Sequence, residues 1–404
     1  MSAKKTSYQK NILGELFLTE SSSCAELSER IEKSLSLVTK MVNELVDEGL
    51  VIEKGLAPSS GGRRPLTYSL KPDSFYIVAV AMDQFVSRIA ILDAHKNFVA
   101  AAKEIELSLA KNDQALAMLT ENILSVLETT KVDRDKVIGI GIGMPGFIDP
   151  HKGANYTFLG VDICAYIKMR TNLPVFIEND SSAIALAEYK FGAARGERNA
   201  MVVNIGWGVG LGMIIDNKLF RGEDGFAGEF SHIPLFQNGK LCSCGKIGCL
   251  ETESSLNYML DRASAEIKNG KPSFLKPAIL ASSNHEQKFQ QFIQAAIIGD
   301  SLTVGIISDV AYNIGRGIAI LIHLLNPSKI ILSGRGSAAG RIWLAPVQHA
   351  INEFCIPRLV GNTKVVVSTL NHDAEIIGAA SLVIENIKDC SIEKIFVKHS
   401  LTKH

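Results

Sequence analysis

One histidine and three cysteines lie close together in the sequence and form the clearest candidate metal site. His232, Cys242, Cys244 and Cys249 have the spacing H-x9-C-x-C-x4-C, with two glycines inside the cysteine segment. Three thiolates and one imidazole complete the tetrahedral shell of a structural zinc ion, and the glycines allow a tight turn between the sulfurs. The alternative is three buried free thiols that are neighbours only in sequence. Because three of the seven cysteines fall within eight residues, the sequence favours structural zinc.

A second group of polar residues follows a short apolar stretch. The stretch is a predicted buried strand at 175–177. Asn179 and Asp180 come just after it and precede a predicted helix over 182–191. An amide and a carboxylate there can bind vicinal hydroxyl groups, and Asp180 could accept a proton from a hydroxyl as a general base. The alternative, which is compatible with the first, is that both residues cap the helix. Glu229 and Glu251 flank the candidate metal site, where an ordered metal would help to position them for a polyhydroxy ligand.

The first seventy residues predict three short helices followed by a hairpin. Apolar residues recur at helical spacing over 8–18 and 25–31, and Ser34 is a suitable N-cap for a third helix. Two short apolar strands follow, over 50–52 and 66–70, with a glycine-rich turn between them. This order of elements is typical of a winged helix-turn-helix.

In a helix-turn-helix the second helix of the pair enters the major groove of DNA. Its exposed face would present hydrogen-bonding side chains to phosphates and bases, and two arginines on the wing suit a narrow minor groove. The module could instead serve for dimerisation or protein docking, and nine basic against nine acidic residues leave its charge neutral. Because the basic residues fall where DNA would lie, we expect DNA contacts from Ser34, Ser36, Thr39, Lys40, Asn43, Arg63 and Arg64.

After residue 75 the chain alternates strands and helices. A first ribonuclease-H-like lobe is predicted from strands 76–82, 86–92, 98–107 and 137–143 and a helix over 114–129. A second is predicted from strands 200–205, 211–215, 329–332 and 365–367 and helices 254–268 and 301–325, and a closing helix is predicted over 374–387. We expect an α/β protein with a winged helix at 1–72, a first lobe at 73–195 completed by 374–388, and a second lobe at 196–373 carrying the zinc knuckle and oligomerisation helices. Residues 389–404 show no clear pattern.

The composition is that of an ordinary globular protein. Apolar residues make up 47% and charged residues 21% of the 404, and 42 basic residues balance 42 acidic ones, so the net charge indicates no partner. The longest apolar run, 317–325, is about half the roughly 18 residues that span a bilayer, and the N-terminus has no secretory apolar region. We therefore expect a cytoplasmic protein, neither membrane-bound nor secreted, with reduced cysteines.

Four segments together resemble the ROK family of repressors, open reading frames and sugar kinases. They are residues 139–146, 178–180, 224–232 and 242–251, and the resemblance extends over about 8–385. It implies an actin-like sugar-kinase fold and a homo-oligomer, either a dimer or a tetramer. It also implies that Asn179, Asp180, Glu229, His232 and Glu251 contact the sugar, with His232 a zinc ligand as well. Ser231 departs from the glycine that the family usually has there.

The nucleotide half of the family pattern is degraded. Family kinases have an Asp-x-Gly-Gly-Thr loop, which here reads Asp-Gln-Phe-Val-Ser over 83–87. Large side chains then stand where phosphate oxygens must approach backbone N–H groups. A second loop, usually Gly-Thr-Gly, has Trp207 at its centre, and 333–336 keeps only part of the nucleotide pattern. Phosphoryl transfer depends on positioning, so we expect no enzyme, with Asp180 a vestigial base.

These observations predict a sugar-responsive transcriptional regulator of carbohydrate metabolism genes, and more specifically a repressor. Its winged helix would bind double-stranded operator DNA, and a sugar or sugar phosphate would bind in the cleft between the lobes. One alternative is an active sugar kinase with an appended regulatory head. The other is an interaction protein that docks a sugar transporter or another regulator through its zinc lobe.

Overall fold

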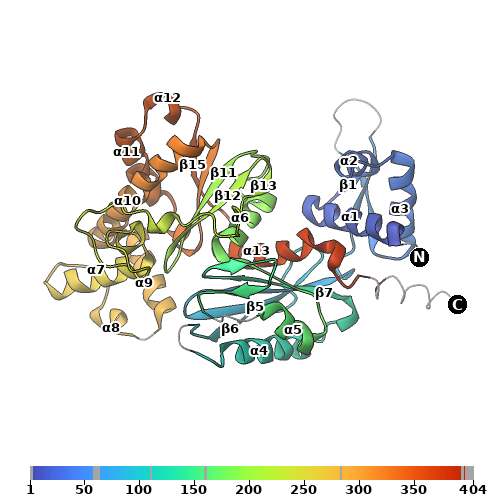
Figure 1. Cartoon of the computed structure of the whole chain (residues 1–404), viewed down its shortest axis with the longest axis horizontal. Helices are drawn as coiled ribbons and strands as arrows, with labels where there is room; N and C mark the ends of the chain where they lie inside the picture. Colours follow the sequence, from blue (N-terminus) through green and yellow to red (C-terminus); the bar gives the residue numbers. More distant parts are fainter. Residues whose placement is uncertain are drawn as a thin grey trace. The chain divides into compact units, whose positions relative to one another are not determined.

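The computed structural model describes residues 3–57, 64–109, 112–158, 162–282, 284–392 and 395. The chain forms two compact units. Figure 1 labels the helices and strands that make them up. The first unit contains the described residues up to Asn179 and those from Ala379 onwards, and the second runs from Asp180 to Gly378. This division does not coincide with the three parts expected from the sequence, which therefore remain a prediction.

The winged helix-turn-helix expected at the start of the chain is present. Ser23 begins its second helix with a capping box, in which the hydroxyl of Ser23 accepts the N–H of Glu26 and the carboxylate of Glu26 accepts the N–H of Ser23. Gly49, at φ 68°, supplies the left-handed turn after the third helix. The elements are α1 (Ala3–Thr19), β1 (Ser22–Ser23), α2 (Cys24–Arg30), α3 (Leu35–Asp47), β2 (Val51–Leu56) and β3 (Leu66–Leu70).

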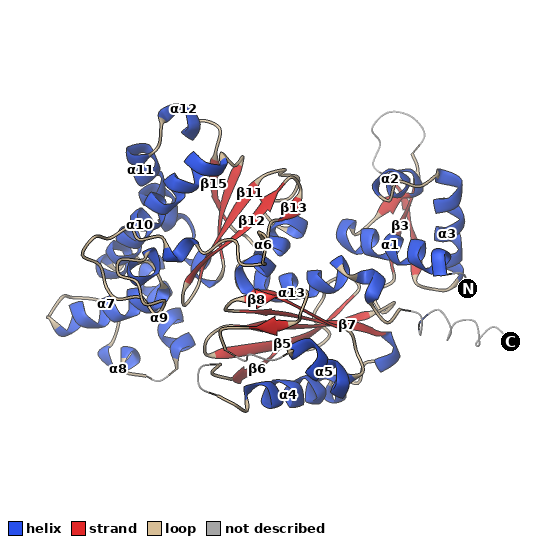
Figure 2. Cartoon of the chain, in the orientation of Figure 1, coloured by secondary structure: helices blue, strands red, loops and turns tan. Residues whose placement is uncertain are grey.

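The rest of the first unit is a five-stranded sheet with the order β10-β7-β4-β5-β6. Strands β4, β5 and β6 form an antiparallel meander, and β7 and β10 extend it in parallel. Helices α4 (Ala115–Thr129) and α5 (Ile163–Thr171) cover one face (Figure 2). The strands are β4 (Tyr76–Met82), β5 (Val86–Asp93), β6 (Lys103–Glu106), β7 (Val137–Met144) and β10 (Val175–Asn179), with a small hairpin of β8 (Ile148–Asp149) and β9 (Ala154–Asn155) beside them.

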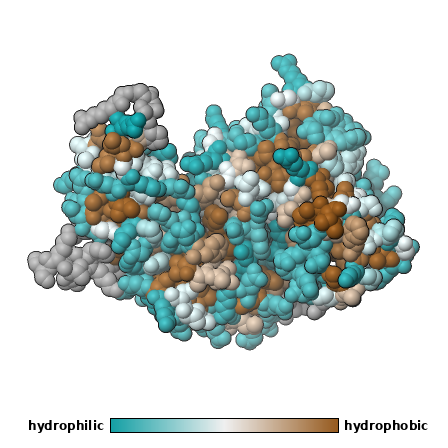
Figure 3. Space-filling model, turned by 180° about the vertical axis from the view of Figure 1, so that it is seen from behind, coloured by the Kyte–Doolittle hydropathy of each residue, from teal (hydrophilic) through white to brown (hydrophobic). Residues whose placement is uncertain are grey.

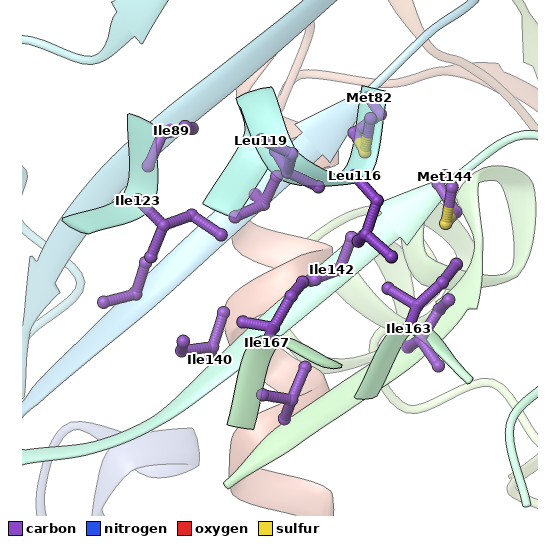
Figure 4. Close-up of a cluster of buried hydrophobic side chains, with 14 of the residues drawn as sticks. Met82, Ile89, Leu116, Leu119, Ile123, Ile140, Ile142, Met144, Ile163 and Ile167 are labelled. Carbon is purple, nitrogen blue, oxygen red and sulfur yellow. The ribbon is translucent and has the colours of Figure 1, made fainter. Parts of the chain in front are cut away.

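The two faces of β7 carry different residues because side chains alternate along a strand. Ile140, Ile142 and Met144 point into the apolar core beneath α4 and α5 (Figure 4). Gly139 and Gly141 alternate with them and face α13 (Asp373–Glu385), where a Cβ on Gly141 would overlap the carbonyl oxygen of Ala379. The backbone of α13 therefore lies directly on the sheet, which only glycine permits at this distance.

The second unit repeats this sheet, with the order β13-β12-β11-β14-β15. Again three strands form an antiparallel meander and two extend it in parallel, so the predicted duplication of a ribonuclease-H-like lobe is confirmed. Glycine again allows close packing, because a Cβ on Gly212 of β12 would overlap Ala185 of α6. The strands are β11 (Ala200–Ile205), β12 (Val209–Ile215), β13 (Lys218–Leu219), β14 (Lys329–Ser333) and β15 (Lys364–Val367).

The helices of the second unit include several that the sequence pattern did not reveal. Helices α9 and α11 were not predicted, and neither was α5 of the first unit. The helices are α6 (Asp180–Phe191), α7 (Leu256–Lys268), α8 (Pro277–Leu280), α9 (His285–Ile297), α10 (Ser301–Leu325), α11 (Leu344–Phe354) and α12 (Pro357–Val360).

The strand expected over 98–107 is shortened to β6. Phe98 forms only an isolated bridge to Leu92 and its side chain is exposed, so the start of the expected strand does not join the sheet.

Helix α10 is the one described helix that is long and apolar enough to cross a membrane. In this structure 61% of its most apolar window is buried, so it acts as a core helix of the second unit. On the molecular face in Figure 3 the exposed apolar residues form separate patches among hydrophilic ones. The face shows no continuous apolar band.

Two glycine substitutions test the close packing of α13. Gly141→Ala should destabilise the protein by about 1–3 kcal/mol or more, because the new methyl group meets backbone that has no other position to take. Gly305→Ala is the matched control, since nothing lies near its Cβ position within α10, and it should stabilise by up to about 1 kcal/mol. Thermal unfolding measures both, and an unchanged midpoint for Gly141→Ala would contradict the packing argument.

Candidate functional site

The outward face of α3 carries the residues expected to contact DNA. Ser36, Lys40 and Asn43 are exposed on one face at spacings of four and three residues, and Ser34 is the exposed N-cap. The opposite face packs inward through Val38, Met41, Val42 and Leu45.

Three further observations refine this predicted surface. Thr39 is half-buried and bonds to Cys24, whose thiol pKa is raised by burial in spite of that bond. Leu35, 51% exposed in the first turn of α3, was not predicted, although an apolar group there can meet a thymine methyl. Arg64 is exposed, and Arg63 lies outside the described residues.

The four predicted metal ligands come together in the second unit. One ligand atom from each of His232, Cys242, Cys244 and Cys249 lies within 4.8 Å of all the others. Burial and the neighbouring Cys244 and Cys242 raise the pKa of the Cys249 thiol to about 12. A cation would compensate the charge of such thiolates, so the donor set fits a metal ion with soft ligands.

A tight turn builds this cluster. Cys242 donates its N–H to the carbonyl of Lys246 at 2.8 Å, and the N–H of Gly245 returns to the carbonyl of Cys242 at 2.9 Å. Gly245 and Gly248 have φ of 83° and 81°, and a Cβ on Gly248 would overlap the carbonyl oxygen of Phe236. The two glycines therefore determine how the sulfurs converge.

His232 links the metal cluster to the acidic residues of the predicted sugar site. Its Nδ1 lies 3.5 Å from the sulfur of Cys242, and its Nε2 lies 3.5 Å from the carboxylate of Glu229. Burial raises the pKa of Glu229, helped by Glu251 and opposed by His232. Glu251 also accepts the N–H of Val209 at 3.4 Å. The structure thus brings together Glu229, His232 and Glu251.

Asn179 and Asp180 mark the chain's passage between the units. Asn179 ends β10 and donates from its amide to the carbonyl of Gly146 at 3.2 Å within the first unit. Asp180 is the first residue of α6 in the second, so the helix begins earlier than position 182. One oxygen of Asp180 accepts the N–H of Ser181 at 2.7 Å, and the hydroxyl of Ser181 accepts from buried Asn204 at 3.1 Å. Neither Ser181 nor Asn204 was predicted from the sequence, although each is a polar residue at or just after the end of a strand.

The loop after β4 is closed on itself. A single carboxylate oxygen of Asp83 accepts the N–H groups of Phe85 and Val86, each at 2.7 Å, and the N–H of Asp83 donates to the carbonyl of Val86 at 2.9 Å. These are the backbone donors that a phosphate-binding loop would present, and here the loop's own carboxylate occupies them.

The loops at 206–208 and 333–336, the other two segments of the nucleotide pattern, contact each other through large side chains. Trp207 is buried and lies edge-on to His285 and Phe289 of α9, with centroids 5.6 and 6.0 Å apart. The guanidinium of Arg335 lies 5.3 Å from the Trp207 ring and pairs with Glu286, also on α9. Side chains thus fill the space between these loops.

Comparison with known proteins agrees with this geometry. Residues 6–52 match a winged helix-turn-helix DNA-binding model, and residues 87–386 match the ROK family model. The chain belongs to the ROK family. Both the resemblance inferred from the sequence and the expected fold class are confirmed.

Relatives of this ROK protein include both regulators and enzymes. It is 31% identical to the xylose repressor of Caldicellulosiruptor bescii over 372 residues, which cover 90% of this chain and 91% of the relative. It is 32% identical to the glucokinase of Halalkalibacterium halodurans over 288 residues, or 69% of this chain and 86% of the enzyme. A solved ROK family transcriptional regulator, a homologue of the E. coli MLC protein, matches with a TM-score of 0.75 at 26% identity and covers 97% of this chain and 99% of its own.

The four clustered ligands predict the metal content of the purified protein. The purified chain should contain one bound metal ion, and Cys249→Ser should lose it, because a buried thiolate ligand is replaced by a poor one. Cys355→Ser is the control, since this buried thiol lies outside the cluster. Metal content by plasma mass spectrometry, together with the thermal midpoint, measures both variants. An unchanged metal content in Cys249→Ser would refute the site.

Proposed function

We propose that this ROK protein is a sugar-responsive transcriptional repressor that binds operator DNA and has no kinase activity. The observation that carries the proposal is the joining of a winged helix to lobes whose loop after β4 has Phe85 and Val86 in place of the two glycines of the kinase pattern. The relatives with which it shares nearly its full length support the same direction, since they include a protein named a xylose repressor and a solved regulator.

DNA binding would use α3 and the wing. Exposed Ser36, Lys40 and Asn43 would enter the major groove, with Ser34 at the helix start and Arg64 on the wing beside the neighbouring phosphates. Leu35 would add an apolar contact to the hydrogen-bonding groups. Thr39, half-buried against Cys24, would contribute less than the exposed residues.

Two features support the proposed absence of kinase activity. A phosphate group would have to approach the N–H groups of Phe85 and Val86 past two large side chains, where family kinases have glycines, and both N–H groups already donate to Asp83. A nucleotide would also have to displace Trp207 and the paired Arg335 and Glu286. Asp180 would then only hydrogen-bond the sugar.

The sugar would be bound by Asn179, Asp180, Glu229, His232 and Glu251. Carboxylates accept hydrogen bonds from hydroxyl groups, and the Nε2–H of an imidazole whose Nδ1 faces a metal donates one, so such groups together match a polyhydroxy ligand. The orientation of His232 supports this assignment, because Nδ1 faces the cysteines and Nε2 faces Glu229.

A zinc ion would hold His232 in that orientation. Three sulfurs and one imidazole nitrogen are a full tetrahedral set, which suits a structural ion with no open position for substrate. The ion would supply no chemistry beyond ordering the turn. Its effect on the sugar would pass through His232, whose second nitrogen it leaves available to Glu229 and the ligand.

The regulator prediction is tested with DNA and sugars together. Operator duplexes are selected from a random pool by the parent protein, and binding is followed by fluorescence anisotropy. D-xylose, D-glucose, N-acetyl-D-glucosamine and the 6-phosphates of the last two serve as effectors. One of them should change DNA affinity, and Asp180→Asn should weaken that response by removing an anionic acceptor. Asp149→Asn, an acidic residue of the first unit paired with Lys152, is the control. No response to any of these sugars would contradict the proposal.

Variants of the DNA-binding surface give a separate prediction. Lys40→Ala combined with Arg64→Ala should weaken DNA binding by about 1–3 kcal/mol and reduce its salt dependence, because two cationic contacts are lost. Lys168→Ala, an exposed lysine of α5 in the same unit, should leave binding unchanged. Equal affinity of the double variant and the parent would favour a docking role for the head.

The absence of phosphoryl transfer is tested by ADP release with the same sugars. The parent should release none above background, and Mg-ATP alone should leave the thermal midpoint unchanged. A ligand at 100 times its dissociation constant would stabilise by about 2.7 kcal/mol, which is readily visible. A ROK glucokinase measured alongside confirms the assay. Sugar-dependent ADP release by the parent would restore the kinase alternative.

A further inference from the structure

We propose that two lysines, Lys10 and Lys96, hold the winged helix rigidly on the first lobe and thereby transmit the sugar response to DNA. We call this pair the lysine clamp. The inference rests on the proposed function for its regulatory part and on contacts within the first unit for its structural part.

Lys10 reaches from the winged helix to the end of the chain's last described helical segment. It lies on α1, only 4% of it is exposed, and its ammonium group donates to the carbonyls of Lys388 at 2.8 Å and Cys390 at 2.9 Å. These carbonyls lie at the end of the short 3-10 helix η5 (Ile387–Asp389), which follows α13. Both groups are backbone acceptors, and the carbonyl of Cys390 also accepts the N–H of Ile392 at 2.9 Å. A buried ammonium group needs such acceptors, so the position of α1 is tied to that of η5.

Lys96 makes the reciprocal contact from the lobe to the head. It follows β5, and its ammonium group donates to the carbonyl of Phe17 at 3.2 Å in the last turns of α1. It also lies 5.2 Å from the centre of the Phe17 ring and 3.6 Å from the carboxylate of Glu20. A cation near the C-terminus of α1 is favourable because the last carbonyls of a helix carry partial negative charge. Lys10 thus holds the middle of α1, and Lys96 holds its C-terminal turn.

The connecting segment between head and lobe is held as well. His95 contacts the carbonyl of Leu70 at 2.7 Å, and the N–H of Ala94 donates to the carbonyl of Pro72 at 3.0 Å. Lys136 donates to the carbonyl of Asp73 at 2.7 Å. A free linker would let the head turn independently, whereas these bonds oppose such rotation.

The element that Lys10 holds is connected to the helix shared by the two units. The division between the units falls inside α13, between Gly378 and Ala379. Its first part packs on Ala183 of the second unit, and its later part packs on Gly141 of the first, with η5 directly after it. A shift of α13 would therefore be passed through η5 and Lys10 to α1. The clamp would prevent independent motion of the head, which would otherwise cancel that shift.

The test compares DNA affinity with and without the sugar that acts on the parent. Lys10→Met combined with Lys96→Met keeps the aliphatic stems and removes the donors. Coupling between two ligands typically changes affinity about 5–150-fold, and in the double variant we expect the ratio to approach one. DNA affinity without sugar should change much less, because no residue proposed to contact DNA is altered. A merely structural role would lower both affinities together and leave their ratio unchanged.

Matched variants control for the loss of a lysine. Lys5→Met removes a lysine from the same helix, but its partner, Glu44, lies within the head at 3.0 Å, so the sugar response should persist. Lys96→Arg keeps cationic donors at the less buried site and should retain the response. Should the double variant fail to fold, Lys96→Met alone carries the test, with a partial loss expected.

Amide hydrogen exchange of peptides covering residues 8–18 and 384–392 tests the clamp without DNA or sugar. The double variant should exchange faster than the parent in both segments, with the second unit unchanged. Unchanged exchange overturns the proposal, and so does faster exchange with an unchanged sugar response. If the parent responds to none of the sugars, the proposed function fails, and the exchange result alone then decides whether the clamp exists.

Discussion

The packing of a helix on the sheet inside each unit depends on a close backbone approach that glycine makes possible. In β7, Gly139 and Gly141 alternate with isoleucines, so one face of the strand receives α13 at backbone distance while the other builds the core. In β12, Gly210 and Gly212 receive α6 in the same way. Since α6 begins where the chain enters the second unit and α13 crosses back, the position of Asp180 and the path to η5 both follow from these glycines.

The metal cluster and the acidic residues depend on one shared side chain. His232 offers one ring nitrogen to the cysteines and the other to Glu229. An imidazole held on one side by a cation has its orientation and tautomer determined on the other. Under the proposed function, a bound ion would affect the recognition of a polyhydroxy ligand through His232 alone.

The features that would oppose nucleotide binding are side chains that make hydrogen bonds, ion pairs and ring contacts with their neighbours. Asp83 closes its own loop, and Arg335 is placed between Trp207 and Glu286. Each contact stabilises the apo fold while occupying donors or space that a nucleotide would need. If the proposed function holds, this chain is a regulator in which side-chain contacts occupy the nucleotide half of an enzyme fold.

The sequence alone determined the local elements and the chemistry of the donors. Strands β4 and β11 and helix α10 have the predicted bounds, because their apolar periodicity and flanking residues suffice to define them. The ligands His232, Cys242, Cys244 and Cys249 were recognisable because they lie within one short segment. Helix α9 was missed, since its buried face is defined only by partners such as Trp207, distant in sequence.

Only the tertiary structure decided which distant groups meet. Local patterns carry no record of contacts between residues that are far apart in sequence, such as those of Lys10 with residues 388 and 390 or of Arg335 with Glu286 and Trp207. The same holds for Asp83, because a carboxylate followed by large residues does not reveal that it will accept the N–H groups of its own loop. Such contacts depend on the paths of the backbone, which packing between elements selects.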